Sequence, residues 1–331
     1  MKKHMTGRQA VWMAGILAVG ILLLLIPLWK GLAWSDETYE NPEIKMVSEP
    51  AIGVVVTGRA ITAAAVEPVE KTATGTAIGD FQDPEGMTVS SRILVKEGYK
   101  RSPYEDDFVS FLRDYPVYKK KAKVKYYNGT VKEDQSDSAA VLKLPLENIN
   151  LQQQTSSVQR VFAEFYWSSG QYDMISFLTS SGLQADYSKW REGYQLNTDA
   201  SSWLSNPGTP DESYEGLQKF LQVIFQKSNS DSLAKECKKV KLAKLQIGDL
   251  LIQDGNVVMV VDQCQDQDGQ RAYLLAQGGS PAQRFHILTN PAHPDPWYYA
   301  SEMEGEIKTP NATFTTKSLY RHVHKENTET P

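Results

Sequence analysis

Cysteine is scarce in this sequence, which has only Cys237 and Cys264 among its 331 residues. This scarcity excludes a disulfide-stabilised framework and leaves at most one bridge. Neither cysteine has neighbours at a metal-ligand spacing, so we expect no zinc site of the Cys/His type. Cys264 follows an apolar stretch and lies among Gln and Asp residues, which is a poor setting for a reactive thiolate.

The chain also lacks an excess of positive charge. It has 35 Lys and Arg against 40 Asp and Glu, which gives a formal net charge of -5 and a pI near 5.7. A nucleic-acid-binding protein needs a basic face that neutralises phosphates, so we expect no nucleic acid partner. Hydrophobic residues make up 41% of the chain, which is enough to build the core of one or two domains.

Several motifs of common enzymes are missing. The sequence contains no Gly-x-Ser-x-Gly elbow, no glycine-rich phosphate loop and no His-Glu-x-x-His helix. His322 and His324 flank Val323 and would face one side of a strand, but no further metal ligands accompany them. A solvated tail is the simpler interpretation of this pair, and we expect neither a metal nor another cofactor.

One long hydrophobic run lies near the N-terminus. Residues 11–29 read VWMAGILAVGILLLLIPLW without a charge, close to the roughly 20 apolar residues that cross a bilayer. Lys2, Lys3 and Arg8 precede the run and acidic residues follow it, so the positive-inside bias predicts a cytoplasmic N-terminus and an exported remainder. The competing interpretation is a signal peptide cleaved near Gly31-Leu32-Ala33, which exports the same domain.

These features predict a single-pass protein of the cell membrane with five parts. The segment after the run is rich in Ala, Thr, Glu, Gly and Pro and shows no hydrophobic period, which is typical of a spacer. The predicted parts are a cytoplasmic tail (1–10), a transmembrane anchor (11–33), a flexible stalk (34–86), one extracytoplasmic domain (87–322) and a disordered tail (323–331).

Hydrophobic spacing in the exported domain predicts helices first and strands afterwards. A helix begins at Ser102-Pro103 and ends before Pro116, a longer one runs from Leu151 to Gly170, and a third carries Tyr214 to Phe225. Turn signals such as Gly255-Asn256 and Asp268-Gly269 separate the later strands, so we predict an α+β domain with an antiparallel sheet. The predicted strands are 124–127, 139–144, 250–252, 257–261, 272–275 and 284–288.

This order of elements is typical of papain-like cell-wall peptidases. There, a helix N-terminus carries a Cys whose thiolate the helix dipole favours. A Gly-Asp pair opens the following strand, the next strand begins with the His that acts as base, and a polar residue on the strand after it orients that His. In this chain Gly248-Asp249 and then Gly255-Asn256 occupy the corresponding places after the long helix.

The sequence resembles the family called domain of unknown function 4846, which looks like a distant relative of NlpC-type papain-like peptidases. The resemblance runs from about Arg92 to Tyr320 and rests on several segments in the same order. These segments are 111–116 (FLRDYP), 151–153 (LQQ), Arg160 with Glu164, 190–194 (WREGY), 248–253 (GDLLIQ), 274–277 (LLAQ), 281–283 (PAQ), His286, 290–291 (NP) and 297–298 (WY).

The departures from the family pattern fall on the two positions that the chemistry needs. The resemblance implies a Cys after Leu-Gln-Gln, where this chain has Gln154, and a Gly-His pair where it has Gly255-Asn256. An amide forms no thiolate, and Asn cannot accept and return a proton as imidazole does. The resemblance therefore implies an inactive relative that keeps its pocket. Combined with the predicted anchor, it leads to the hypothesis of a membrane-anchored papain-like domain that binds a peptidoglycan peptide or an envelope protein.

The predicted binding cleft is lined by Gln153, Gln154, Asn256, Gln277 and His286. Amides in these places would hydrogen-bond a peptide backbone, because each has a donor and an acceptor. Structural interpretations stand beside this one. Gln153 is equally suited to the free N–H groups of a helix N-terminus, Gln277 to holding a loop carbonyl, and a lone histidine such as His286 to packing in a strand.

Two further functions remain open from the sequence. The first is an active cysteine hydrolase of cell-wall peptides in which Cys237 or Cys264 supplies a displaced thiol and His286 the base. The second is a structural component of an envelope assembly, in which the anchor and the stalk are the important parts.

Overall fold

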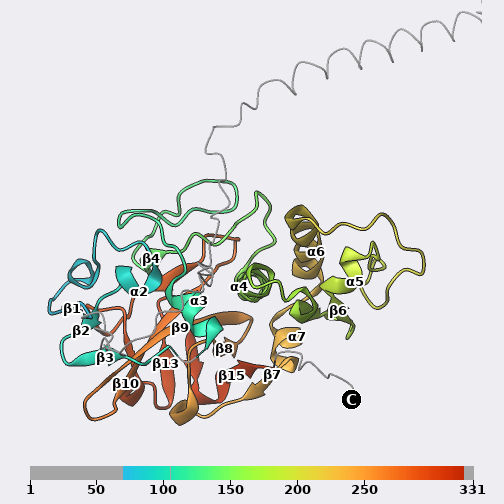
Figure 1. The fold of residues 1–331 in the computed structure, drawn as a ribbon. Coiled ribbons are helices and arrows are strands. Elements are labelled where there is room, and N and C mark those ends of the chain that lie inside the picture. Colours follow the sequence, from blue (N-terminus) through green and yellow to red (C-terminus); the bar gives the residue numbers. More distant parts are fainter. Residues whose placement is uncertain (1–69, 105, 324–331) are drawn as a thin grey trace, which may run out of the picture. The chain divides into compact units, whose positions relative to one another are not determined.

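The computed structural model describes residues 70–104 and 106–323, which all belong to one unit of the chain, Ala60–Pro331 (Figure 1). The predicted anchor at 11–33 and most of the predicted stalk and tail lie outside the described residues. Within the part that is described, no helix combines the length and apolar character needed to cross a membrane.

A nine-stranded sheet lies at the centre of the domain. Its strand order is β4-β11-β10-β9-β8-β15-β7, β12 also pairs with β10 and β3 with β9, and every pair is antiparallel. Asp254 and Gly255 both have positive φ, which closes the tight turn between β8 and β9. The strands are β3 (Tyr99–Arg101), β4 (Ser138–Val141), β7 (Cys237–Lys239), β8 (Leu250–Gln253), β9 (Asn256–Asp266), β10 (Arg271–Gln277), β11 (His286–Leu288), β12 (Tyr298–Tyr299) and β15 (Leu319–His322).

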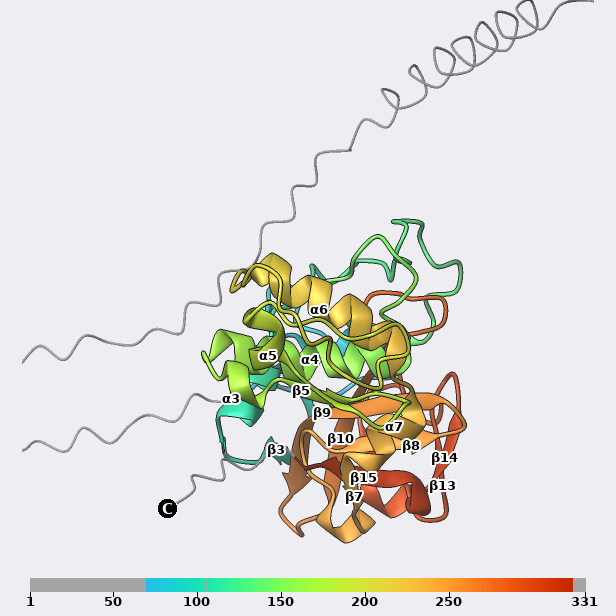
Figure 2. The ribbon, with the colours of Figure 1, turned by 90° about the vertical axis from the view of Figure 1, so that its right-hand side faces the viewer.

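Helices pack on one face of this sheet, as Figure 2 shows for α4 and α6 above the central strands. Successive side chains of a strand point to opposite faces, so Val257, Met259 and Val261 of β9 join Phe162 of α4 and Phe220 of α6 in one core. The helices are α2 (Val89–Arg92), α3 (Asp107–Arg113), α4 (Gln154–Ser168), α5 (Tyr187–Arg191), α6 (Tyr214–Lys227) and α7 (Ser230–Lys235).

A second, smaller core covers the opposite face. Val258 and Val260 of β9 pack there with Phe314 and with Ile307 from the β13–β14 hairpin. The remaining strands form two-stranded pairs: β1 (Thr72–Ala73) with β2 (Val95–Lys96), β5 (Ser176–Leu178) with β6 (Gln184–Asp186), and β13 (Glu306–Lys308) with β14 (Thr313–Thr315). Short 3-10 helices lie at η2 (Ile78–Phe81), η3 (Tyr172–Met174), η4 (Leu242–Lys244), η5 (Ala300–Glu302) and η6 (Thr316–Ser318).

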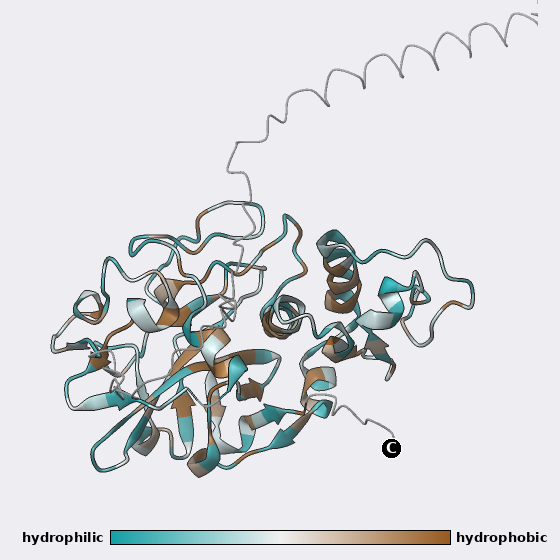
Figure 3. Ribbon diagram, in the orientation of Figure 1, coloured by the Kyte–Doolittle hydropathy of each residue, from teal (hydrophilic) through white to brown (hydrophobic). Residues whose placement is uncertain are grey.

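Helices α4 and α6 are joined by polar contacts as well as by apolar packing. The apolar side of α6, brown in Figure 3, buries Leu217, Phe220 and Ile224. Arg160 Nε lies 2.8 Å from Glu164 Oε1 on α4, and the Tyr214 hydroxyl at the start of α6 donates to the same carboxylate at 2.6 Å. These bonds fix the first turn of α6 against the middle of α4.

The predicted α+β class with antiparallel strands is confirmed, and the boundaries differ in places. The first predicted helix begins later, at Asp107, because the Asp106 carboxylate accepts the Val109 N–H at 2.7 Å and caps the helix there. Residues 124–127 form only isolated bridges to Val131 and Gln283 instead of a strand. Here the Asn128-Gly129 turn closes a short loop and does not lead directly into β4.

Part of the range predicted as stalk is structured. Residues 70–86 contain β1 and η2, and Phe81 is 2% exposed. Isolated apolar residues such as Phe81 give no hydrophobic period, so the periodicity of the sequence did not indicate that this segment packs.

Candidate functional site

Gln154 and Asn256 lie next to each other, although 102 positions separate them in the sequence. Gln154 is the first residue of α4, and Asn256 is the first residue of β9. The contact forms because α4 packs along β9, with Met259 and Phe162 in the same core. The helix N-terminus therefore meets the beginning of the strand.

The Gln154 amide bonds to two groups of β9 at once. Its Nε2 donates to Asn256 Oδ1 at 3.1 Å, and its Oε1 accepts the backbone N–H of Val257 at 2.9 Å. Strand β10 ends at Gln277 and leaves this N–H unpaired within the sheet, so Gln154 supplies the acceptor that the neighbouring strand does not. We call this arrangement the Gln154–Asn256 amide clasp.

A cleft of about 460 Å³ lies beside the amide clasp. The first turn of α4 forms one side, and the β8–β9 turn with the α6–α7 connection forms the others. Of the described residues that line it, Asp254 alone carries a charge, and most of the others are amides or hydroxyls. The lining residues are Asn150, Leu151, Gln153, Gln154, Thr155, Ser156, Phe225, Ser228, Asn229, Ser230, Asp254, Gly255, Asn256 and Ser280.

The helix end that faces the cleft is not capped by a side chain. Gln153 occupies the N-cap position without bonding to the first turn, and its Nε2 instead donates to Asn150 Oδ1 at 3.3 Å. Backbone N–H groups of a first helical turn carry partial positive charge. Together with the amides, this gives the cleft donors and acceptors for a neutral polar ligand, and in the described lining no thiol, imidazole or hydroxyl–base pair that could act as a nucleophile.

Gln277 and His286 lie together, but away from the cleft lining. They face each other across β10 and β11, and their exposed fractions are 3% and 0%. The structure thus divides the five predicted site residues into two groups. Gln153, Gln154 and Asn256 line the cleft, whereas Gln277 and His286 are buried in the sheet.

His286 belongs to a buried polar cluster on the β4 side of the sheet. Its Nδ1 lies 3.0 Å from the Arg284 carbonyl, and its Nε2 lies 3.5 Å from Asp137 Oδ2. Burial acts to raise the pKa of the Asp137 carboxyl, but contacts with His286, Lys132 and Asn311 outweigh burial and hold that pKa well below its usual range. The cluster explains His286 as a buried neighbour of the Asp137 carboxylate.

The structure does not bring either thiol to His286. Cys264 pairs with Ala272 while His286 pairs with Gln277, so about five residues of β10, or roughly 17 Å, separate them. Cys237 lies on β7, about five strand spacings from β11, or roughly 24 Å. Burial also raises the pKa of both thiols, that of Cys237 to about 12.

No pattern in the sequence indicated the parts of the cleft wall that lie outside α4 and β9. Phe225, Ser228 and Asn229 lie where α6 passes into α7, and Ser280 lies in the loop after β10. Asn229 is a residue type that favours the start of a helix, and its side chain accepts the Ser232 N–H at 2.9 Å as the cap of α7. Such a cap predicts a helix start, but not that the helix borders a cleft.

Comparison with known proteins gives a family but no assigned activity. No curated protein and no solved structure matches the chain. The family described as domain of unknown function (4846) matches residues 89–321, a range that contains both α4 and β9 with the amide clasp between them. Because this match covers more than two thirds of the sequence, the chain belongs to the domain of unknown function 4846 family.

Proposed function

We propose that this protein is a catalytically inactive papain-like domain, held at the cell membrane by residues 11–29, that binds a peptide of the cell wall or an envelope protein in the cleft beside the amide clasp. The observation that carries the proposal is the position of Gln154 and Asn256. Gln154 begins α4, Asn256 begins β9, and their side chains are in hydrogen-bond contact at 3.1 Å. The proposal equates these two places with the helix start and strand start that hold nucleophile and base in papain-like enzymes.

The chemistry of the cleft supports binding without turnover. Amides and hydroxyls line it, and each amide offers both a donor and an acceptor to a peptide backbone. Gln154 spends one donor and one acceptor of its amide on β9 and so holds the cleft wall in place. The neighbouring Gln153, Thr155 and Asn229 also line the cleft and are the groups that we expect to meet a ligand.

The active-hydrolase alternative has less support. It needs a thiol near an imidazole, and His286 is roughly 17 Å from Cys264 and further from Cys237 along the sheet. If the protein hydrolysed wall peptides through either thiol, replacing both cysteines by Ala would abolish that hydrolysis.

Co-sedimentation of the full chain with insoluble peptidoglycan, in detergent, tests the proposal. We expect retention that falls at least tenfold in Thr155→Arg, because the long side chain fills the cleft beside α4. Thr198→Arg places the same residue at an exposed position outside the cleft and should bind as the wild type does. An absence of retention, together with no cross-linked partner in isolated membranes, would refute the proposal.

A further inference from the structure

A second and larger hollow, of about 890 Å³, lies at the other end of β9. Asp262, the ion-pair partner of Arg101 in its lining, is about six residues along β9 from Asn256, or roughly 20 Å. The hollow is therefore separate from the cleft beside the amide clasp. Its volume is in the range of small-ligand sites.

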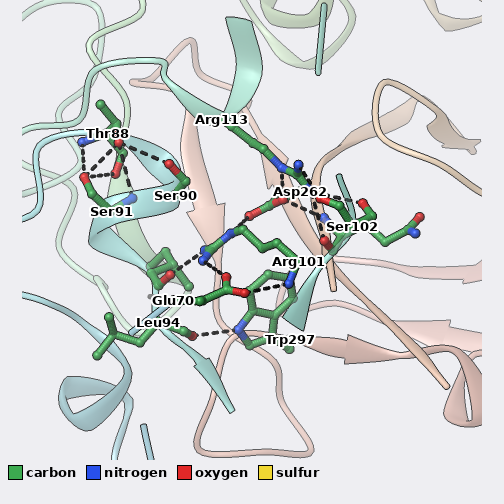
Figure 4. A network of polar contacts seen from close by, with 12 residues as sticks. Glu70, Thr88, Ser90, Ser91, Leu94, Arg101, Ser102, Arg113, Asp262 and Trp297 are labelled. Atoms are coloured by element: carbon green, nitrogen blue, oxygen red, sulfur yellow. Dashed lines mark hydrogen bonds and ion pairs between the residues drawn. The ribbon is translucent and has the colours of Figure 1, made fainter. Parts of the chain in front are cut away.

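Arg101 lines this hollow and belongs to a buried ionic group with Arg113 and Asp262. Asp262 is fully buried and receives Arg101 Nε at 2.5 Å and Arg113 Nε at 2.7 Å (Figure 4). Arg113 is also fully buried and donates to Ser102. These three residues carry a net charge of +1, which a buried group must balance with a further anion.

Glu70 supplies the balancing carboxylate. Its Oε1 accepts from Arg101 Nη1 at 2.7 Å, and its Oε2 accepts from the Arg101 backbone N–H at 2.8 Å. Figure 4 shows Arg101 between Glu70 and Asp262, with the Trp297 ring beside it. One guanidinium edge and one N–H thus form a two-point carboxylate receptor that faces the hollow.

The carboxylate and its receptor come from different parts of the chain. Arg101, Arg113 and Asp262 lie within the range matched by the family, residues 89–321, whereas Glu70 precedes it by 19 positions. The matched domain therefore contains the positive receptor without the anion that neutralises it.

Part of the rim of the hollow is apolar. Met87 and Tyr104, two of the few large hydrophobic side chains that are exposed in the described residues, both line it, at 44% and 55% exposure. Leu94 and Pro103 complete the apolar wall. The other charges at the rim are the Lys71–Asp83 ion pair, which is neutral as a pair, and the exposed Glu85, whose field solvent screens.

We infer that this hollow is a binding site for a carboxylate carried on an apolar body, and that Glu70 occupies its charged end as a tethered competitor. A ligand of this class would place its carboxylate on Arg101 and its apolar part against Met87 and Tyr104. A tethered group acts at an effective concentration on the order of millimolar or higher. Glu70 should accordingly weaken the binding of a free carboxylate by tenfold or more.

Calorimetric titration of the full chain with 3-phenylpropionate tests this inference. We expect Glu70→Ala to bind the probe at least tenfold more tightly than the wild type, and 3-phenylpropanamide, which lacks the charge, to show no such gain. Glu97→Ala removes an exposed acid outside the hollow and should bind as the wild type does. A second pair of probes, an N-acetyl dipeptide with a free carboxylate and its amide, distinguishes a peptide C-terminus from a simple organic acid as the source.

Two results would overturn the inference. One is an equal affinity of wild type and Glu70→Ala for the carboxylate probes, and the other is equal binding of carboxylate and amide. If Glu70→Ala does not fold, Glu70→Gln keeps the side-chain shape and removes only the charge, and the same comparison applies. Because the cleft is about 20 Å away, Thr155→Arg should leave these affinities unchanged, which separates this test from that of the proposed function.

Discussion

At the scale of single residues, Gln154 takes the place of a neighbouring strand, because its side chain accepts a backbone N–H of β9. Its amide satisfies the Val257 N–H where β10 has ended, and it also holds the Asn256 side chain. Val257 is fully buried, so on folding its N–H loses its hydrogen bond to water. Without Gln154 no other group in the described part of the chain would replace that bond. The two residues that we propose to stand at papain-like catalytic positions are here part of the packing between helix and sheet.

A double-mutant cycle measures this contact. Gln154→Ala should lower the free energy of unfolding by about 1–3 kcal/mol because it leaves the buried Val257 N–H without an acceptor, and Asn256→Ala by about 0.5–1.5 kcal/mol. Urea denaturation should give a coupling energy of roughly 0.5–1.5 kcal/mol for the pair. Strictly additive effects would contradict the clasp. Gln226→Ala, at an exposed position of α6, is the matched control and should change little.

Glu236 predicts a pH dependence of stability. Burial raises the pKa of its carboxyl to about 7, although Gln184 and the Leu178 N–H bond to it and act in the opposite direction. A carboxyl whose folded pKa exceeds its unfolded value of about 4.3 stabilises the fold most below pH 4.3 and loses that contribution as pH rises to 7.

In the wild type the free energy of unfolding should fall by about 2–3 kcal/mol between pH 4.5 and pH 7, and Glu236→Gln should abolish this fall. The amide oxygen can still accept from Leu178, so the fold is kept. Glu304→Gln, at an exposed position, should retain the wild-type slope. Identical slopes in both variants, measured by denaturation across this pH range, would show that Glu236 does not titrate as described.

At the scale of elements, the cleft depends on a close approach of β10 to α4. Gly278 follows β10 directly, and a Cβ added there would lie 2.2 Å from Ser157 Oγ and 3.2 Å from the Gln153 carbonyl oxygen. Only a glycine leaves room for the helix N-terminus at this place. The position of the first turn of α4, and with it one side of the cleft, rests on this contact.

Gly278→Ala should consequently destabilise the protein by about 1–3 kcal/mol through overpacking. In the matched control, Gly79→Ala, an added Cβ meets nothing within 4 Å and the φ angle is ordinary, so stability should hold or rise slightly. Thermal unfolding of the two variants makes the comparison. Equal melting temperatures of Gly278→Ala and Gly79→Ala would mean that α4 can move away from β10 without loss of stability.

Several elements could be predicted from the sequence, and their reasons are local. The apolar runs of the sequence predict β8 to β10, and the helical spacing of apolar residues predicts α4 and α6. These patterns match the structure because the apolar residues of each element are the ones that it buries. The meeting of Gln154 and Asn256 could be anticipated only because a family layout placed them together. Secondary-structure propensity and hydrophobic periodicity describe neighbours along the chain, so they do not predict a contact between residues 102 positions apart.

The remaining features depend on long-range pairing that no local pattern shows. β15 lies between β8 and β7, which moves the C-terminal strand into the sheet beside strands far earlier in the chain. His286 pairs with Gln277 and reaches Asp137 because β11 lies next to β4. Arg101, Arg113 and Asp262 likewise come from three separate elements, β3, α3 and β9, so no local pattern predicts their ionic group.

For the whole molecule, the expected membrane anchor lies outside the described residues and stays a prediction. Carbonate extraction should leave the full chain with the membranes, whereas a chain lacking residues 1–33 should be released. A mature N-terminus just after Ala33 would instead identify a cleaved signal peptide. Replacing residues 11–33 by an unrelated membrane helix should preserve binding if the anchor only tethers, and a loss of binding would favour a structural role in an envelope assembly.

The central claim is that Gln154 and Asn256 occupy the nucleophile and base positions of a papain-like site. The most direct test compares Gln154→Cys with the double variant Gln154→Cys/Asn256→His, by the rate at which iodoacetamide alkylates the introduced thiol at pH 6, with the modified position identified by peptide mass mapping. An imidazole in contact with a thiol at a helix N-terminus lowers the thiol pKa far below about 8.5, so we predict at least a tenfold faster reaction in the double variant. Equal rates in the two variants would contradict the account.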